Sequence, residues 1–219
     1  MPRAAAAAAA SETSQHNKRK MTTIGTHDGS FHCDEALGCF LLQQTAKYEH
    51  AEVVRTRDPE VLNGLDVVID VGATYEPEKN RFDHHQRGFE EVFGHGFVTK
   101  LSSAGLVYKH FGREIVARVL QLPEDDQRVE KIYLKVYKSF IEGVDGIDNG
   151  VNMYDTDKPA RYVDNTGLSA RVGKLNPAWN EDFSAASQMT QFRKAMAMAG
   201  GEFVVRILWA VVKVPCPRF

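Results

Sequence analysis

The sequence predicts an α/β fold with a mostly parallel sheet flanked by helices. Short runs rich in β-branched residues alternate with longer segments of helical period from Met21 onward. One run, residues 65–71 (LDVVIDV), is apolar at nearly every position, as expected of a strand buried on both faces. Neither a P-loop nor a G-x-G-x-x-G pattern follows the first strand, which disfavours a nucleotide-dependent kinase or dehydrogenase.

The amino-acid composition limits the classes of protein to which the chain can belong. Hydrophobic residues make up 43% of the 219 residues and charged residues 26%, which suits one large domain or one domain with part of a second. The net charge of −2 creates no basic field, so a nucleic-acid partner would need local Arg and Lys or metal ions to hold it. Three cysteines without C-x-x-C spacing indicate a reducing compartment. We expect no membrane partner, because no uninterrupted apolar run reaches the ~18 residues that span a bilayer.

The first half of the chain supplies the strands. We expect short strands over residues 22–24, 51–55, 65–71 and 81–83. Residues 34–46 predict a helix, because Ala36, Leu37 and Phe40 fall on one face and two acidic residues occupy its positive N-terminus.

The second half is mainly helical by its period. Residues 102–120 and 125–142 predict helices, with breaks near Gly112 and Pro123. Glycines and aspartates crowd residues 143–167, which predicts a long functional loop. Further helices are expected from about Ser169 and over residues 184–199, and residues 203–214 are expected to form a helix or strand of the core.

These patterns divide the chain into three parts. Residues 1–20 contain an alanine run followed by Lys18, Arg19 and Lys20, and we interpret them as a disordered or targeting tail. Residues 21–165 form the main α/β domain. Residues 166–219 begin a second helical region.

Metal-ligand residue types gather after the first predicted strand. His27, His32 and Asp34 lie in a turn between a strand and a helix, and such turns meet at the carboxyl edge of an open parallel sheet. Imidazole and carboxylate donors together suit Mn²⁺, Fe²⁺, Zn²⁺ or, less well, Mg²⁺. The alternative is that Asp34 only caps the helix and the histidines are loop residues.

Two more groups follow later strands. Asp70 comes directly after Val67, Val68 and Ile69, where an unpaired carboxylate is costly to bury. At the end of the last strand, His84 and His85 point to opposite faces, so one can bind a metal while the other donates a hydrogen bond to a phosphate.

A late aspartate completes the pattern. Asp145 is the favoured ligand and Asp148 the alternative, because Asp148 also belongs to a good turn sequence, Asp-Asn-Gly. At least five ligand-type groups then stand at the ends of α/β elements, enough to hold two cations that share one carboxylate and activate a water.

Basic residues offer contacts for a phosphate or nucleic acid. Arg161, Arg171 and Lys174 follow the acidic loop, and Arg55 and Arg57 follow the second strand. The alternative for each is a solvated surface charge.

The order of these motifs resembles the DHH phosphoesterase superfamily. The closest resemblance is to the melanocyte-proliferating-gene family, an uncharacterised metal-dependent hydrolase family. It is carried by the segments GTHDGSFHCDEAL, VVIDVGATYEPEKNRFDHHQRGF, LSSAGLVY, FIEGVDGIDNGV and LSARVGKLNPAWN. The resemblance implies a DHH-type domain with two divalent cations, Mn²⁺ ahead of Mg²⁺. It also implies 3′–5′ RNA exonuclease activity, and location in the nucleus or mitochondrion, with the cytoplasm as an alternative.

The resemblance also assigns roles to single residues. The implied metal ligands are His27, His32, Asp34, Asp70, His84 and Asp145, with Asp148 as the alternative. Asp70 would bridge the cations, His85 would contact the phosphate or leaving group, and Asp83 would orient a histidine.

The family resemblance ends at about Phe203, and family members continue into a second domain that helps to hold the substrate. We therefore expect that domain to be largely missing and the C-terminal end to be divergent. Two alternatives to an exonuclease stay open: a phosphatase or pyrophosphatase for a small substrate, and an inactive short form with a binding role. The metal, the direction of digestion, RNA against DNA and the oligomeric state are not determined at this stage.

Overall fold

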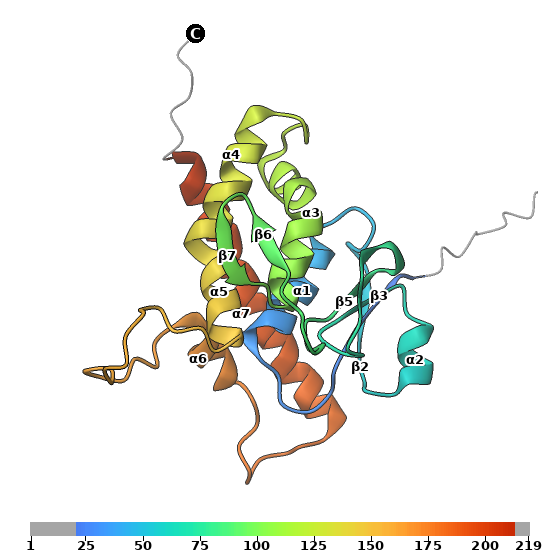
Figure 1. Ribbon diagram of the computed structural model, residues 1–219. Coiled ribbons are helices and arrows are strands. Elements are labelled where there is room, and N and C mark those ends of the chain that lie inside the picture. The colour runs from blue at the N-terminus through green and yellow to red at the C-terminus, as the bar shows by residue number, and fades with distance from the viewer. Residues whose placement is uncertain (1–20, 213–219) are drawn as a thin grey trace, which may run out of the picture.

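A mostly parallel sheet lies beside a larger group of helices in the computed structural model, which describes residues 21–212 (Figure 1). Its strands are β1 (Thr23–Thr26), β2 (Glu52–Arg55), β3 (Val67–Ile69), β4 (Tyr75–Glu76) and β5 (Arg81–Phe82), in the order β2-β1-β3-β5-β4. All neighbouring pairs are parallel except β4 and β5. The predicted α/β class and mostly parallel sheet are therefore confirmed.

The central strand is buried on both faces, as its apolar run predicts. Val67 and Ile69 belong to the main core, whereas Val68 packs with Leu62 in a small second cluster. Leu62 lies on α2 (Pro59–Asn63), which begins at the N-cap Asp58. Successive side chains of a strand point to opposite faces, so one three-residue strand contributes to both clusters.

Three long helices build the main core. They are α1 (Cys33–Gln43), α3 (Ser103–Leu120) and α7 (Ala185–Val212), and α1 contacts both of the others. The short α6 (Leu168–Gly173) and α7 bury Val172, Phe192 and Phe203 in the same apolar cluster as α1. By length and composition alone, α7 could also cross a membrane, although 39% of its most apolar window is buried inside the fold.

Two of the differences from the predicted helix boundaries involve glycines. Gly112 does not break α3, because it lies where the Tyr133 ring leaves no room for a side chain. Residues 143–148, expected as loop, are helical: α4 (Gln127–Val136) continues through a π-helical turn (Tyr137–Ile141) into α5 (Glu142–Asp148). Burial of Val144 and Asp145 holds this turn in place despite its glycines.

A β-hairpin was not predicted from the sequence. Strands β6 (Val92–Gly94) and β7 (Phe97–Lys100) join through a turn in which Gly94, His95 and Gly96 all have positive φ. Phe93 stacks on Tyr137 with 3.6 Å between ring centroids, which fixes the hairpin against the π-helical turn.

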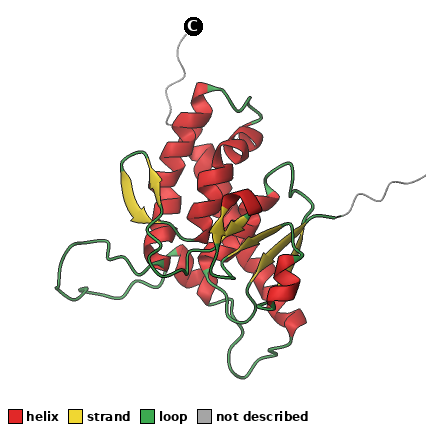
Figure 2. Ribbon diagram, turned by 45° about the vertical axis from the view of Figure 1, so that its right-hand side comes forward, coloured by secondary structure: helices red, strands yellow, loops and turns green. Residues whose placement is uncertain are grey.

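The long segment after α5 is irregular, as the sequence predicts. Residues 149–167 contain no helix or strand and form the extended loop that Figure 2 shows in green.

A short 3₁₀ turn (Pro77–Lys79) separates β4 from β5. The predicted tail, residues 1–20, and residues 213–219 lie outside the described residues.

Candidate metal centre

The predicted ligands come from the carboxyl ends of three parallel strands. His27 follows β1, Asp70 follows β3, and the Asp83–His85 segment follows β5. The chain leaves β1 toward β2 on one side, while β3 lies on the other side of β1. Ligand sites in open α/β sheets form at such a change of strand order.

His27 points one ring nitrogen at two carboxylates. Its Nδ1 lies 2.9 Å from the Asp28 carbonyl oxygen, so Nδ1 carries the hydrogen. Its Nε2 then faces Glu35 Oε1 at 3.1 Å and Asp70 Oδ2 at 3.3 Å. Burial lowers the pKa of His27, but the hydrogen bonds to Asp70 and Glu35 more than offset this effect and raise it to about 10. The position therefore attracts a positive charge, either a proton or a metal ion.

His84 repeats this arrangement on the other side of Asp70. Its Nδ1 lies 3.3 Å from Asn149 Oδ1, and the Asn149 amide nitrogen donates to the Lys100 and Asp145 carbonyls. Because those donors fix the amide, Oδ1 is an acceptor and His84 Nδ1 is protonated. His84 Nε2 then faces Asp148 at 3.2 Å, Asp70 at 3.4 Å and Asp34 at 3.9 Å.

The surroundings of Asp34 indicate whether the site suits a cation. Its side chain is buried, and neither carboxylate oxygen has a hydrogen-bond partner among the described residues. Burial and the nearby Asp70 and Asp148 raise the pKa of Asp34 well above its usual value. A buried carboxylate without donors is expensive unless a cation lies against it. The N and O donors present suit a first-row divalent metal ion.

Asp70 joins the two halves of the site. Potential ligand atoms lie within 4.8 Å of one another in three groups: His27, His32, Glu35 and Asp70; Asp70, His84 and His85; and His32, Asp34 and Asp148. Ser103, the first residue of α3, donates its hydroxyl to Asp70 Oδ1 at 3.1 Å. Burial raises the pKa of Asp70, but His27 and His84 outweigh it and hold that pKa below its usual range.

His85 lies at the surface of the site. Its side chain is 60% exposed, and Asp83 accepts hydrogen bonds from both its backbone N–H and its Nδ1. The other Asp83 oxygen accepts from the Ala73 backbone N–H at 2.6 Å. Asp83 therefore orients His85 toward a cavity of about 700 Å³, which His27, His32 and Asp70 also line.

The structure separates the two candidate late aspartates. The Asp145 carboxylate accepts hydrogen bonds from the Ser102 backbone and hydroxyl at 3.0 and 2.7 Å and from the Tyr137 hydroxyl at 3.1 Å. Asp148, the alternative, lies one helical turn further along α5 and faces His84. The site thus gathers Asp148 and leaves Asp145 in a separate buried network.

The basic residues predicted to bind substrate lie elsewhere. Arg171 donates to the Thr166 carbonyl and pairs with Glu202, and Lys174 donates to the Asn165 carbonyl at 3.4 Å. Arg161 is exposed on the irregular loop. The described residues that line the 700 Å³ cavity include none of these three.

Sequence reasoning did not single out three residues of the site. Glu35 accepts two hydrogen bonds from the His32 backbone N–H and lies against His27. Glu35 lies at position N3, three residues after the N-cap, where a Glu usually caps the helix. Because this explanation is sufficient, the sequence does not identify Glu35 as a possible ligand. Ser103 and Asn149 act through Asp70 and His84, and no local pattern identifies them.

Comparison with known proteins supplies a second line of evidence. A family model described as "Uncharacterised protein family (UPF0160)", with the name MYG1_exonuc, matches residues 23–216. This match extends beyond Phe203, where we expected the family-like sequence to end. "MYG1 exonuclease" of Mus musculus is 50% identical over 191 residues, covering 84% of this chain and 49% of that protein.

Two further relatives extend the comparison. "MYG1 exonuclease" of Homo sapiens is 47% identical over 192 residues (84% of this chain, 50% of that protein), and "MYG1 protein" of Dictyostelium discoideum is 46% identical over 185 residues (84% and 56%). The chain thus spans about half the length of the curated relatives it matches. No solved structure matches.

Proposed function

This chain belongs to the MYG1 family (UPF0160), and on that premise we propose that it is a metal-dependent phosphodiester hydrolase that acts on RNA as a 3′–5′ exonuclease. The mammalian relatives are named exonucleases, which supports a nucleic-acid substrate. RNA as the substrate and the 3′–5′ direction come from the motif resemblance. The proposal extends from the relatives to a chain about half their length.

One observation carries the proposal. The Nε2 atoms of His27 and His84 face different carboxylate oxygens of Asp70, at 3.3 and 3.4 Å, and each also faces a second carboxylate, Glu35 or Asp148. Asp70 is shared by two of the three groups of potential ligand atoms. This arrangement suits two cations bridged by one carboxylate, as in two-metal hydrolases.

The residues of the chain have distinct tasks in this proposal. Bound cations would lower the pKa of a water and stabilise negative charge on a phosphoryl oxygen. His27, Asp34, His84 and Asp148 would hold them, with His32 and Glu35 within reach. Imidazole ligands favour Mn²⁺ over Mg²⁺.

His85 is suited to proton transfer. Its Nδ1 hydrogen is engaged by Asp83, so Nε2 is the nitrogen that can reach a ligand in the cavity. A protonated Nε2 would give its hydrogen to the oxygen that leaves phosphorus. Asp83 would stabilise the resulting orientation throughout.

A labelled RNA tests the proposal directly. A 5′-labelled single-stranded RNA is incubated with the chain and Mn²⁺ or with chelator, and the products are separated by length. We expect a Mn²⁺-dependent ladder of shortened labelled products, since digestion from the 3′ end preserves the label. Immediate release of a labelled mononucleotide would instead indicate the opposite direction.

Two histidine variants provide the comparison. His84→Ala should abolish cleavage and weaken Mn²⁺ binding measured by calorimetry, whereas His50→Ala removes an exposed histidine outside the site and should change neither. Cleavage only of pyrophosphate or a dinucleotide would favour the small-substrate phosphatase. Folded, Mn²⁺-loaded protein that cleaves nothing would favour an inactive form.

A further inference from the structure

Two glycines are among the residues that line the cavity beside the candidate metal centre. Gly29 and Gly72 both line it, with φ of +83° and +96°, and no atom lies within 4 Å of the place where a Cβ would stand. A side chain at either position would be strained and would project into open space. Glycines at such positions allow a ligand to approach the backbone closely.

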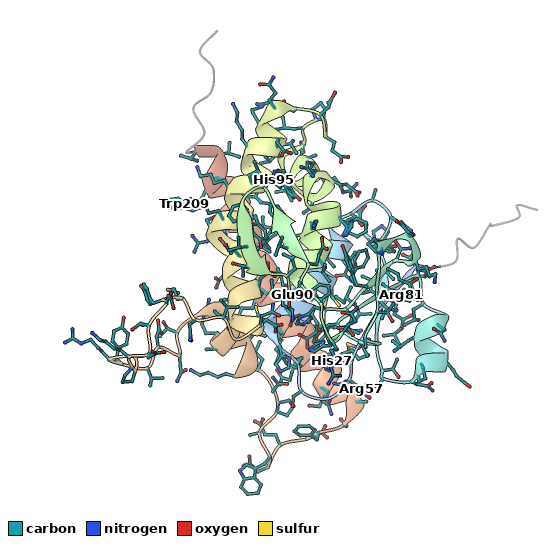
Figure 3. All side chains as sticks on the ribbon, in the orientation of Figure 1. His27, Arg57, Arg81, Glu90, His95 and Trp209 are labelled. Atoms are coloured by element: carbon teal, nitrogen blue, oxygen red, sulfur yellow. The ribbon has the colours of Figure 1, made fainter. Side chains whose placement is uncertain are left out.

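Arg57 is the one Arg or Lys among the described residues that line this cavity. It follows β2, and Figure 3 shows it beside His27. Its side chain is 63% exposed, and its Nε lies 3.4 Å from Asp28 Oδ1. An exposed ion pair of this kind contributes little free energy, so an anionic ligand can compete for the guanidinium group.

Arg55, two residues earlier, makes the contrast clear. Its guanidinium donates to the carbonyls of His27 and Gly29 at 3.1 and 2.7 Å and lies over the Phe192 ring. Arg55 therefore holds the loop that carries His27, and it is not among the residues that line the cavity. Of these two arginines, Arg57 is the one that lines the cavity, and its side chain is largely exposed.

We propose that Arg57 forms an anion subsite for the phosphate next to the one that is hydrolysed. The inference rests on the proposed function, in which the cations bind the phosphate that reacts. When the cations hold the reacting phosphate, the guanidinium group can bind a second phosphate of the same ligand. A monophosphate has no second phosphate and gains nothing from this contact. The site would thus select nucleotides with two phosphates, such as the end of a nucleic-acid strand, over simple monoesters.

Binding of two small nucleotides tests the subsite without requiring cleavage. Calorimetry on the full chain with Mn²⁺ compares uridine 3′,5′-bisphosphate with uridine 5′-monophosphate. The wild type should bind the bisphosphate at least roughly tenfold more tightly, as expected for one charge-assisted contact. Arg57→Ala should reduce this ratio to about one and leave the affinity for the monophosphate unchanged. Arg57→Lys should keep part of the ratio, because a point charge replaces a planar fork.

Arg193→Ala is the matched control, because it removes the same charge from an exposed position on α7 outside the cavity. It should leave the ratio unchanged. Equal ratios in the wild type and Arg57→Ala, or no preference in the wild type, would overturn the subsite even if RNA is cleaved. An Arg57-dependent preference in a protein that cleaves no RNA would leave the subsite standing and overturn the proposed function.

Discussion

Two aspartates on α5 lie three residues apart in contrasting surroundings. Asp148 faces His84 across the metal centre, whereas Asp145 is fully buried among Ser102 and Tyr137. The Asp145 network sits directly behind Ser103, the residue that donates to Asp70. At the scale of single residues, one carboxylate suits a ligand and the other supports the helix end behind it.

The protonation of Asp145 should make stability depend on pH. Burial raises the pKa of Asp145 to about 7, from a usual value near 3.8, and the Ser102 and Tyr137 donors offset this only in part. The folded state therefore binds a proton that the unfolded state has lost, and its contribution to stability is lost as pH rises through about 7. Compared with Asp145→Asn, the wild type should lose free energy of unfolding between pH 5 and pH 8.

Urea denaturation of both proteins in chelator measures this difference. Chelator removes the contribution of metal binding, and the titratable groups of the candidate metal centre, including the nearby Asp148, are common to both proteins. A difference between wild type and variant that stays constant from pH 5 to pH 8 would show that Asp145 keeps an ordinary pKa.

Between elements, the packing of α1 against α7 depends on one glycine. A Cβ on Gly200 would overlap the ring of Phe40 on α1, whereas the neighbouring Gly201 has open space around it. The two glycines share the helical conformation and differ only in what faces them. Substitutions at these two positions therefore distinguish the effect of helix propensity from the effect of packing.

Substitution of each glycine by alanine should have opposite effects. Gly200→Ala should destabilise the fold by about 1–3 kcal/mol, the usual effect of overpacking a core. Gly201→Ala should stabilise it by about 0.5–1 kcal/mol, because alanine favours a helix. Chemical denaturation measures both values. Equal stabilisation by the two substitutions would mean that α1 and α7 do not approach this closely.

At the scale of the whole molecule, the metal centre gathers segments that are distant in the chain. The residues come from the ends of three strands, β1, β3 and β5, and from α5: His27, Asp70, His84 and Asp148. The unfolded chain does not bring them together. Binding of a metal ion at these residues would be linked to folding, because only the native state brings them together. Without a metal, the buried carboxylates oppose one another.

Mn²⁺ should therefore raise the unfolding temperature. At a concentration 100 times the dissociation constant, binding contributes about 2.7 kcal/mol, which is roughly 5–10 °C for a chain of this size. Asp34→Asn should abolish this rise, yet in chelator it should unfold at or above the wild-type temperature, because it removes a buried carboxyl whose ionised form is opposed by burial and by Asp70 and Asp148. Thermal unfolding followed by circular dichroism measures all four conditions. A full Mn²⁺ response in Asp34→Asn would remove Asp34 from the metal centre.

The α/β class and the sheet edge that carries the candidate site could both be predicted from the order of residues alone. Residues 65–71 predicted a doubly buried strand, and β3 lies there with α2 on one face and the main core on the other. The polar residues after each strand could be found because parallel strands end at a common edge. These features depend on local periodicity and on a general property of parallel sheets, so one sequence suffices to find them.

Which of the candidate residues face one another could not be predicted without the packed fold. Asp145 and Asp148 have the same side chain, and the helical turn that separates them forms because Val144 and Asp145 are buried against other elements. Glu35, Ser103 and Asn149 matter through contacts 8 to 65 residues away in the chain. Such contacts depend on the direction in which each side chain points after the elements have packed. That direction cannot be inferred from the order of residues.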